Sequence, residues 1–271
     1  MSDRSEQDAQ PEAGAGRRAL VIGASSGIGR ALVRQLAGEG YRVAALARRA
    51  EELATLEAEQ REGQGERCGE VQPSAAGRVS GYVHDVRDLD AVDELFERVV
   101  RELGGLDLCI FAAGIMPPVG EDEFDTHKDT AMIEVNLAGC VAWLNPVARL
   151  FASQRGGTLV GISSVAGDRG RTKAPVYGAT KAAMNTYLES LRNRLADSGV
   201  HVCTIKPGFV DTAMLGGAED LPWVISAEIA ARRILRAARR RVNVRYVPMR
   251  WWWVMAVIRS IPSWLFSKLR I

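Results

Sequence analysis

The stretch Ala19-Leu-Val-Ile-Gly-Ala-Ser-Ser-Gly-Ile-Gly-Arg-Ala-Leu32 decides the fold of this chain. Its apolar start ends at Gly23, and beyond Gly29 the apolar residues follow the spacing of a helix. We therefore predict a strand, a tight turn and a helix N-terminus, in that order. Glycines let a backbone approach a pyrophosphate closely, and the free N–H groups and the dipole of a helix start favour that anion. The residues expected to bind a nucleotide here are Gly23, Ser25, Ser26, Gly27, Ile28 and Gly29.

The same change from strand to helix spacing repeats along the chain. Apolar strands that alternate with helices predict a parallel sheet covered by helices on both faces, and right-handed crossovers make it doubly wound. The expected fold is a single-domain α/β Rossmann fold, because 271 residues with 47% hydrophobic content can bury one such core. Strands are expected at 19–22, 42–47, 79–83, 107–111, 157–162, 200–206 and 243–247, and helices at 27–38, 49–60, 88–103, 127–153, 175–197 and 226–240.

The ends of the chain and one connection do not follow this pattern. Residues 1–16 are polar without an apolar stretch, which predicts a disordered tail rather than a signal peptide. The glycine-rich connection at 61–78 is expected to be a mobile loop remote from the chemistry. The main domain is therefore placed at 17–248, followed by a distinct segment at 249–271. The chain has four cysteines, Cys68, Cys109, Cys140 and Cys203. They do not have the spacing of metal ligands, so we expect no metal site and a protein of the reducing cytoplasm.

Tyr177 and Lys181 are four residues apart in a predicted helix, so they share one face. An ammonium held beneath the phenol would stabilise phenolate and lower the pKa of the tyrosine from about 10 toward the working range. Tyr177 is thereby a candidate general acid or base. Ser164, 13 residues upstream, and Asn136 are further polar candidates. Each has an ordinary alternative: a solvated surface pair, a serine that caps a turn, or a satisfied amide in the core.

Taken together, the glycine pattern, Asn136, Ser164, the Tyr177–Lys181 pair and Pro207-Gly-Phe-Val-Asp-Thr212 resemble the main branch of the short-chain dehydrogenase/reductase family. The resemblance runs from about Arg18 to Ile234, with the motifs in the family's order and spacing. It implies hydride transfer between a nicotinamide cofactor and an alcohol or carbonyl group. Further cofactor contacts implied by the resemblance are Asp85, Val86, Ala113, Gly114, Pro207, Gly208, Val210 and Thr212.

The resemblance also implies the catalytic roles. Tyr177 would exchange a proton with the substrate oxygen, and Ser164 would hydrogen-bond the same oxygen. Lys181 would hold the nicotinamide ribose as well, while Asn136 would fix a break in its helix and a water that links Lys181 to solvent. The chain departs from the family pattern at Ile22, where Thr is usual, and in Phe111-Ala-Ala-Gly114, where Asn-Ala-Gly is usual. In the family those two polar groups lie side by side. Because both are replaced here, we expect an apolar contact in their place, with no polar group left without a hydrogen-bond partner.

Cofactor choice is expected at the end of the second strand. An NAD enzyme of this fold places an acidic residue there, which binds the ribose 2′-OH and would repel a 2′-phosphate. Ala47 takes that position and Arg48 follows, so a guanidinium is available for the phosphate of NADP(H). The alternative, arginines that only open a surface helix, can account for Arg49 but not for the missing acid.

The C-terminal part is the least similar to the family. Residues 221–271 contain ten Arg and one Lys but only one acid, Glu228, so this segment has a net charge of +10. Residues 1–220 have a net charge of −8. Three consecutive tryptophans begin at Trp251, between Arg250 and Arg259, a pattern typical of a bilayer interface. A helix that roofs the substrate pocket and a dimer interface are the alternatives. Since all four catalytic candidates precede this segment, removing 249–271 is expected to spare the catalytic core.

The sequence thus predicts an NADP(H)-dependent oxidoreductase that acts on a carbonyl or secondary alcohol of an apolar small molecule, in the cytoplasm or on the inner face of a membrane. A homo-oligomer is expected, and no reading motif suggests nucleic-acid binding. The alternative function is a non-catalytic nucleotide-binding sensor or scaffold on the same fold. Residues expected to line or border the substrate pocket are Met116, Pro117, Ala166, Arg169, Leu215 and Trp223.

Overall fold

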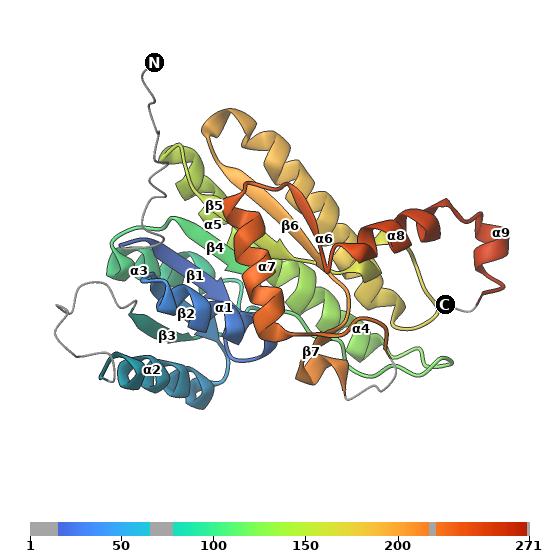
Figure 1. Cartoon of the computed structure of the whole chain (residues 1–271), viewed down its shortest axis with the longest axis horizontal. Helices are drawn as coiled ribbons and strands as arrows, with labels where there is room; N and C mark the ends of the chain where they lie inside the picture. The colour runs from blue at the N-terminus through green and yellow to red at the C-terminus, as the bar shows by residue number, and fades with distance from the viewer. Residues whose placement is uncertain (1–15, 66–77, 217–220, 270–271) are drawn as a thin grey trace, which may run out of the picture.

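A computed structural model of the chain describes residues 16–65, 78–216 and 221–269. Within these residues the main sheet has the strand order β3-β2-β1-β4-β5-β6-β9, and each neighbouring pair is parallel (Figure 1). The order reverses between β1 and β4, which confirms the doubly wound Rossmann fold. The strands are β1 (Arg18–Ile22), β2 (Arg42–Ala47), β3 (Val79–Val83), β4 (Leu108–Phe111), β5 (Thr158–Ile162), β6 (His201–Pro207) and β9 (Val244–Val247), with the short pair β7 (Val210–Asp211) and β8 (Ile225–Ser226) outside the sheet.

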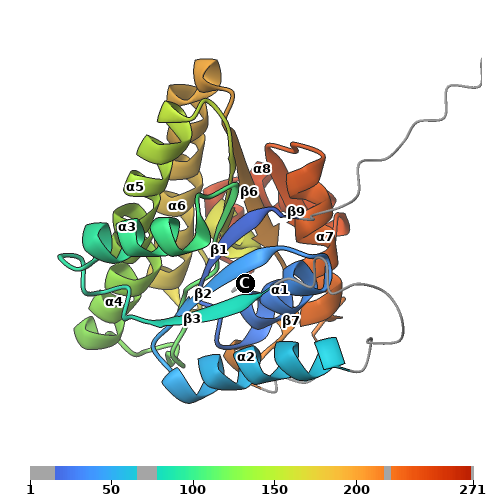
Figure 2. The same cartoon turned by 90° about the vertical axis from the view of Figure 1, so that its left-hand side faces the viewer.

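Helices cover both faces of this sheet (Figure 2). Alternate residues of a strand point to opposite faces, so Val21 belongs to the core under α1, α2 and α7, whereas Leu20 belongs to the core under α3, α5 and α6. Both side chains are fully buried, which is why the strands are apolar at successive positions. The helices are α1 (Gly27–Gly38), α2 (Ala50–Gly65), α3 (Val92–Leu103), α4 (Thr126–Ile133), α5 (Gly139–Ser153), α6 (Pro175–Arg194), α7 (Ala227–Arg239), α8 (Arg250–Ser260) and α9 (Ser263–Phe266).

The single helix predicted at 127–153 is interrupted. A π-helical turn, η1 (Glu134–Ala138), separates α4 from α5. Asn136 lies in this turn, and its side chain bonds both the N–H and the carbonyl of Ile115. A π-turn widens the helix by one residue and commonly marks a functional site. The spacing of apolar residues does not show the interruption, because its partner lies on the loop after β4, but the family resemblance implied a break in the helix at Asn136 and the structure has one there.

Of the described residues, one helical stretch, 126–153, is long and apolar enough to cross a membrane. Its most apolar window has a mean hydropathy of 1.3, and 56% of that window is buried. Trp143 and Phe151 are fully enclosed in the core with α3 and α6. The stretch is therefore apolar because it is a core helix of the Rossmann fold.

Two expectations about irregular segments concern residues outside the described ranges. The connection predicted at 61–78 begins later than expected, because α2 continues to Gly65. Its remainder, 66–77, and most of the tail at 1–16 lie outside the described residues.

The C-terminal segment packs onto the fold by one face. After β9 the chain forms α8, in which Trp251 and Met255 are buried against Val165 and Tyr246. A Cβ at Gly208 would overlap the indole of Trp251, so the loop after β6 accepts that ring only because it has glycine there. This packing argues against the expectation that 249–271 can be removed without consequence for the core.

Candidate active site

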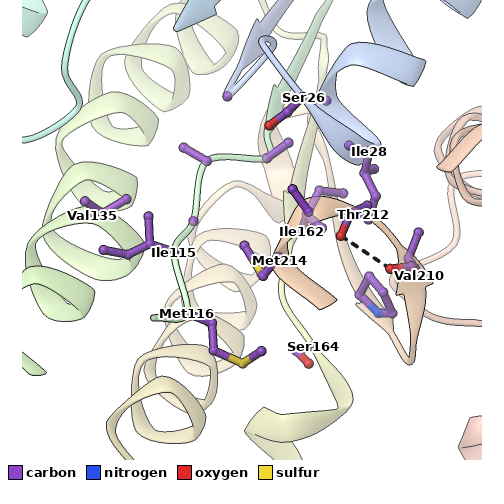
Figure 3. Close-up of a pocket in the computed structure, with 18 of the residues that line it drawn as sticks. Ser26, Ile28, Ile115, Met116, Val135, Ile162, Ser164, Val210, Thr212 and Met214 are labelled. Carbon is purple, nitrogen blue, oxygen red and sulfur yellow. Dashed lines mark hydrogen bonds between the residues drawn. The ribbon is translucent and has the colours of Figure 1, made fainter. Parts of the chain in front are cut away.

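A cavity of about 300 Å³ lies at the carboxyl ends of the central strands, where a doubly wound sheet binds its ligands. It joins the glycine turn after β1 to the end of β5, the start of α6 and the loop after β6 (Figure 3). Most residues predicted for the site line this cavity together: Gly23, Ser25, Ser26, Gly27, Ile28, Gly29, Arg48, Val86, Ala113, Gly114, Ser164, Tyr177, Lys181, Pro207, Gly208, Val210 and Thr212.

The glycine turn is built by close backbone approaches. Gly23 has φ 91°, a left-handed conformation, and a Cβ there would overlap the backbone at Ala113. The N–H of Ala112 donates to the carbonyl of Ile22 at 2.8 Å, so the backbone path beside the turn continues the sheet. Ile22 pairs in register with Phe111, and both side chains are fully buried. The two departures from the family pattern therefore lie in well-packed apolar surroundings.

Two arginines line the cavity just after the end of β2. Arg48 is half-exposed, with Nη1 3.7 Å from the carboxylate of Asp85. Arg49 turns back to the glycine turn, and its Nη2 donates to the hydroxyl of Ser25 at 2.9 Å. Asp85 accepts 2.6 Å and 3.0 Å hydrogen bonds from the guanidinium of Arg87, which lowers the pKa of its carboxyl together with the charge of Arg48. Asp85 is not among the cavity-lining residues, whereas Arg49 is.

Asn136 and Lys181 both lie beside Gly114, and of the two only Lys181 lines the cavity. Asn136 is fully buried; its Oδ1 accepts from the N–H of Ile115 at 2.7 Å, and its Nδ2 donates to the hydroxyl of Thr180 at 3.3 Å. The Nζ of Lys181 donates to the carbonyl of Ile162 at 2.9 Å. A Cβ at Gly114 would lie 3.3 Å from Asn136 Oδ1 and 3.5 Å from Lys181 Nζ, so that glycine leaves room for both groups. Burial lowers the pKa of Lys181 to about 8.

Tyr177 and Ser164 both line the cavity, and Ser164 influences the pKa of the tyrosine. Ser164 lies two residues after the end of β5 and caps the short 3-10 helix η2 (Val165–Asp168), since its Oγ accepts from the N–H of Ala166 at 3.1 Å. Burial raises the pKa of Tyr177, and hydrogen bonding with Ser164 and the charge of Arg171 act in the opposite direction. Lys181 Nζ lies 5.8 Å from the centre of the Tyr177 ring. The groups that lower the pKa of Tyr177 against the effect of burial are therefore Ser164 and Arg171 rather than Lys181.

The substrate side of the cavity is mainly apolar. Met116 extends toward it from the loop after β4, and Met214 from the 3-10 helix η4 (Ala213–Leu215) after β7 (Figure 3). Of the residues predicted to line or border the pocket, Met116 and Leu215 do line it. The cavity-lining set does not include the other four, which are Pro117, Ala166, Arg169 and Trp223.

Two arginines of the cavity were not predicted from the sequence. Arg171, in the loop before α6, lines the cavity and is half-buried, which lowers the pKa of its guanidinium. Its position between Ser164 and Tyr177, six residues before the tyrosine, was the available signal, because the segment that joins two candidate residues of one site lies near that site. Arg49 was not among the predicted cofactor contacts, because an arginine that opens a surface helix could account for it, although it follows Arg48 directly after the end of β2.

Comparisons with known proteins agree with this geometry. The sequence profile of the short chain dehydrogenase family matches residues 17–221. The chain belongs to this family. An uncharacterised oxidoreductase of Staphylococcus saprophyticus is 31% identical over 238 residues, which cover 86% of this chain and 96% of the relative. Another, of Myxococcus xanthus, is 37% identical over 199 residues, covering 73% of this chain and 74% of the relative.

Solved structures share the fold of this short-chain dehydrogenase. A short-chain type dehydrogenase/reductase from Mycobacterium ulcerans is 25% identical with a TM-score of 0.74, covering 85% of this chain and 88% of the other. The structure of ElxO with NADP bound is 23% identical with a TM-score of 0.71, covering 85% of this chain and 96% of that one. The predicted family and the predicted class, an oxidoreductase, are confirmed.

Proposed function

We propose that this short-chain dehydrogenase is an NADP(H)-dependent oxidoreductase that interconverts a carbonyl and a secondary alcohol on an apolar substrate, with Tyr177 as the general acid and base. The observation that carries the proposal is the convergence of Ser164, Tyr177 and Lys181 in the cavity that also contains the glycine turn. A nucleotide bound at that turn would reach the same cavity in which a substrate oxygen can contact the tyrosine.

The residues of the cavity fit a nicotinamide dinucleotide. The turn from Gly23 to Gly29 leaves backbone N–H groups of the first turn of α1 free for a pyrophosphate, because the side chain of Ser26 makes no capping bond. Arg48 and Arg49 supply two guanidinium groups where an acid would bind a ribose diol. When bound, the cofactor supplies or accepts the hydride. Preference for NADP(H) is thus supported by charge, and the fold neighbour with NADP bound is consistent with it.

The protein groups supply the proton and the alignment. Because burial raises the pKa of Tyr177, the phenol is protonated at neutral pH and can donate to the oxygen of a carbonyl. Ser164 hydrogen-bonds that oxygen from the side and stabilises the charge that develops on it. The positive charge of Arg171 stabilises the phenolate that remains after proton transfer. In the opposite direction, the phenolate removes the proton of an alcohol.

Substitution of Tyr177 by Phe tests the proposal. Turnover of carbonyl compounds with NADPH, including steroids, long-chain ketones and quinones, is expected to fall by about 10²–10⁴-fold, the usual effect of losing general acid–base catalysis. NADPH affinity, measured by fluorescence titration, is expected to stay within a few-fold. Tyr187→Phe is the matched control, because Tyr187 lies on the same helix but bonds Asn145 outside the cavity.

The outcomes separate the proposal from its alternative. Near-native activity of Tyr177→Phe would exclude the tyrosine as the proton donor. A protein that binds NADPH tightly but turns over none of these compounds would instead be a nucleotide-binding sensor or scaffold.

A further inference from the structure

Helix α8 is apolar on two opposite faces. Its inner face is buried through Trp251 and Met255, as described above. Its outer face carries Trp253 and Val257, which are 68% and 66% exposed. A soluble surface helix normally turns polar residues outward, and a helix that is apolar all round is covered on all sides. The outer face of α8 therefore lacks a covering partner in the described part of the chain.

Helix α9 and the turn that follows it add further exposed apolar side chains beyond α8. Trp264 is 67% exposed, and Leu265 and Leu269 are also exposed. Figure 1 shows α9 projecting from the body of the molecule beyond α8, at the end of the chain. We call this area the tryptophan surface; it consists of Trp252, Trp253, Val257, Trp264, Leu265 and Leu269. Six large apolar side chains in one short segment exceed the scattered exposure that is normal for a soluble protein.

Cations surround this surface. Arg250 and Arg259 mark the two ends of α8, and Lys268 follows α9. Lys268 Nζ lies 5.8 Å from the ring centre of Trp264, and the guanidinium of Arg250 lies 5.2 Å from that of Trp223. The single acid of 221–271, Glu228, is in the first turn of α7. The charged side chains that α8 and the described residues after it contribute beside the tryptophan surface are thus all basic.

We propose that the tryptophan surface binds the face of a membrane that contains anionic lipids. Indole rings favour the headgroup region, aliphatic side chains the acyl boundary, and Arg and Lys the lipid phosphates. The 11 residues of α8 cover only about 16 Å as a helix, roughly half of a hydrocarbon core, so α8 lies on the membrane rather than across it.

A second copy of the chain fits the surface less well. A two-fold dimer would place the same patch of each subunit face to face. The basic surroundings of Arg250, Arg259 and Lys268 would then meet their own copies without acids to pair with. An anionic lipid surface supplies the complementary charge.

The surface is held in place before binding. Arg169 donates from Nη1 to the carbonyls of Ile258 and Arg259, at 3.1 Å and 3.0 Å, which satisfies the C-terminal end of α8. Its guanidinium also lies 4.3 Å from the ring centre of Phe266 and so connects α9 to the same point. Since α8 is already packed on the body and Arg169 connects α9 to its end, docking requires little additional ordering.

Docking would bring the active-site cavity close to the lipid. Gly208 and Phe209 line the cavity, and Trp251 packs on both from the side of α8. Trp223, whose ring contacts Trp251, lies at the edge of the same region. If the proposed oxidoreductase function holds, the substrate is therefore an apolar carbonyl or alcohol that partitions into membranes.

Vesicle flotation of the full-length protein tests the proposal. Binding is expected to vesicles with about one third phosphatidylglycerol, and to be much weaker with phosphatidylcholine alone or at high salt. Trp253→Ser with Val257→Ser is expected to weaken partitioning about tenfold or more. Arg250→Gln with Arg259→Gln is expected to reduce the preference for anionic vesicles by about fivefold per cation. The control is Val83→Ser with Leu89→Ser, two exposed apolar residues at and beyond β3, the opposite edge of the sheet from β9.

The proposal is overturned if the full-length protein fails to float with anionic vesicles, or if the Trp253/Val257 variant floats as well as the control. A change of oligomeric mass in that variant, without flotation of the original protein, would make the tryptophan surface a dimer interface. Tyr177→Phe is expected to float normally, so binding can be judged even if no substrate is found. Conversely, turnover without flotation would support the proposed oxidoreductase function and contradict membrane binding.

Discussion

Ala47, Arg48 and Arg49 occupy the position at which this fold distinguishes its two dinucleotides. The half-exposed guanidinium of Arg48 and the Ser25-bound guanidinium of Arg49 can both approach a 2′-phosphate. We expect the protein to bind NADPH more tightly than NADH. Each charged contact to a phosphate contributes about 1.5–3 kcal/mol, so one arginine corresponds to about tenfold in affinity or more.

Replacing Ala47 by Asp together with Arg48 by Ala is expected to reverse this preference, because attraction to the phosphate becomes repulsion. Titration of protein fluorescence with both cofactors measures the change. Arg49→Ala alone is expected to weaken NADPH binding and leave NADH binding nearly unchanged. Equal affinity of the original protein for the two cofactors would contradict the assignment.

Lys181 carries a stability penalty for its place in the site. Its pKa is lowered from 10.5 to about 8 by burial, so the folded state disfavours the ammonium at neutral pH. One pKa unit corresponds to about 1.4 kcal/mol, and the hydrogen bond to Ile162 offsets part of the gain from removing the charge. We expect Lys181→Met to be about 1–2 kcal/mol more stable at pH 7 and to lose activity, measured by urea unfolding and turnover.

The pH dependence has a definite sign. Between pH 8 and 10.5 the unfolded lysine binds more proton than the folded one, so the stability of the original protein rises with pH through this window. The advantage of Lys181→Met should shrink over the same range. Lys173→Met, at a 75% exposed side chain, is the control that should show neither effect.

For single residues, the sequence predicted the positions that are determined by spacing within one strand or helix. Ser164 just after the end of β5, and Tyr177 and Lys181 on α6, lie together because strand and helix geometry determine where consecutive residues point. Arg171 and Arg49 could not be placed that way. The direction of a long side chain from a loop or a helix start depends on tertiary contacts, such as that between Arg49 and Ser25.

Among the elements, η2 has the most direct influence on the position of Ser164. Asp168 at its end is buried, with Oδ1 2.5 Å from Lys206 Nζ and Oδ2 accepting from the hydroxyl of Tyr246 at 2.7 Å. These two bonds tie η2 to β6 and β9 and so hold the backbone that follows the serine. Burial raises the pKa of Tyr246, and the hydrogen bond to the Asp168 carboxylate raises it further.

Asp168→Asn is expected to destabilise the protein by about 3–5 kcal/mol, because it leaves the ammonium of Lys206 buried without a counter-charge. The double variant Asp168→Asn with Lys206→Met removes both charges and is expected to recover a large part of that stability. Urea unfolding of the two variants makes the comparison, and equal stability of both would show that the ion pair is not the cause.

The boundaries of most elements followed from the apolar pattern. Strands β1 to β6 and β9 begin and end within one residue of the prediction, because turns and glycines interrupt the apolar runs sharply. The start of α3 was placed four residues early, in the polar stretch before Val92. The π-turn at Asn136 could not be predicted from local pattern, since its bonds reach Ile115, 21 residues away.

For the whole molecule, the sequence left the place of the C-terminal segment open. Because α8 is apolar on both faces, its periodicity does not indicate which face packs on the protein. The structure selects Trp251 and Met255 through contacts with Gly208 and Tyr246, residues from distant parts of the chain. Charge separation along the sequence, in contrast, was directly readable, with +10 in the last 51 residues.

Truncation distinguishes the two roles of this segment. Removing 249–271 would expose Tyr246, Val165 and the Gly208 loop, which also borders the cofactor site. Losing a buried tryptophan alone costs about 3–5 kcal/mol, or about 10 °C in Tm for a domain of this size, so we expect at least that shift and weaker NADPH binding. Removing 262–271 takes away α9 but keeps α8, and is expected to lower Tm only slightly while reducing flotation with anionic vesicles. Thermal unfolding and NADPH titration of both truncations measure these effects. An unchanged Tm after removal of 249–271 would mean that α8 contributes nothing to the fold in solution.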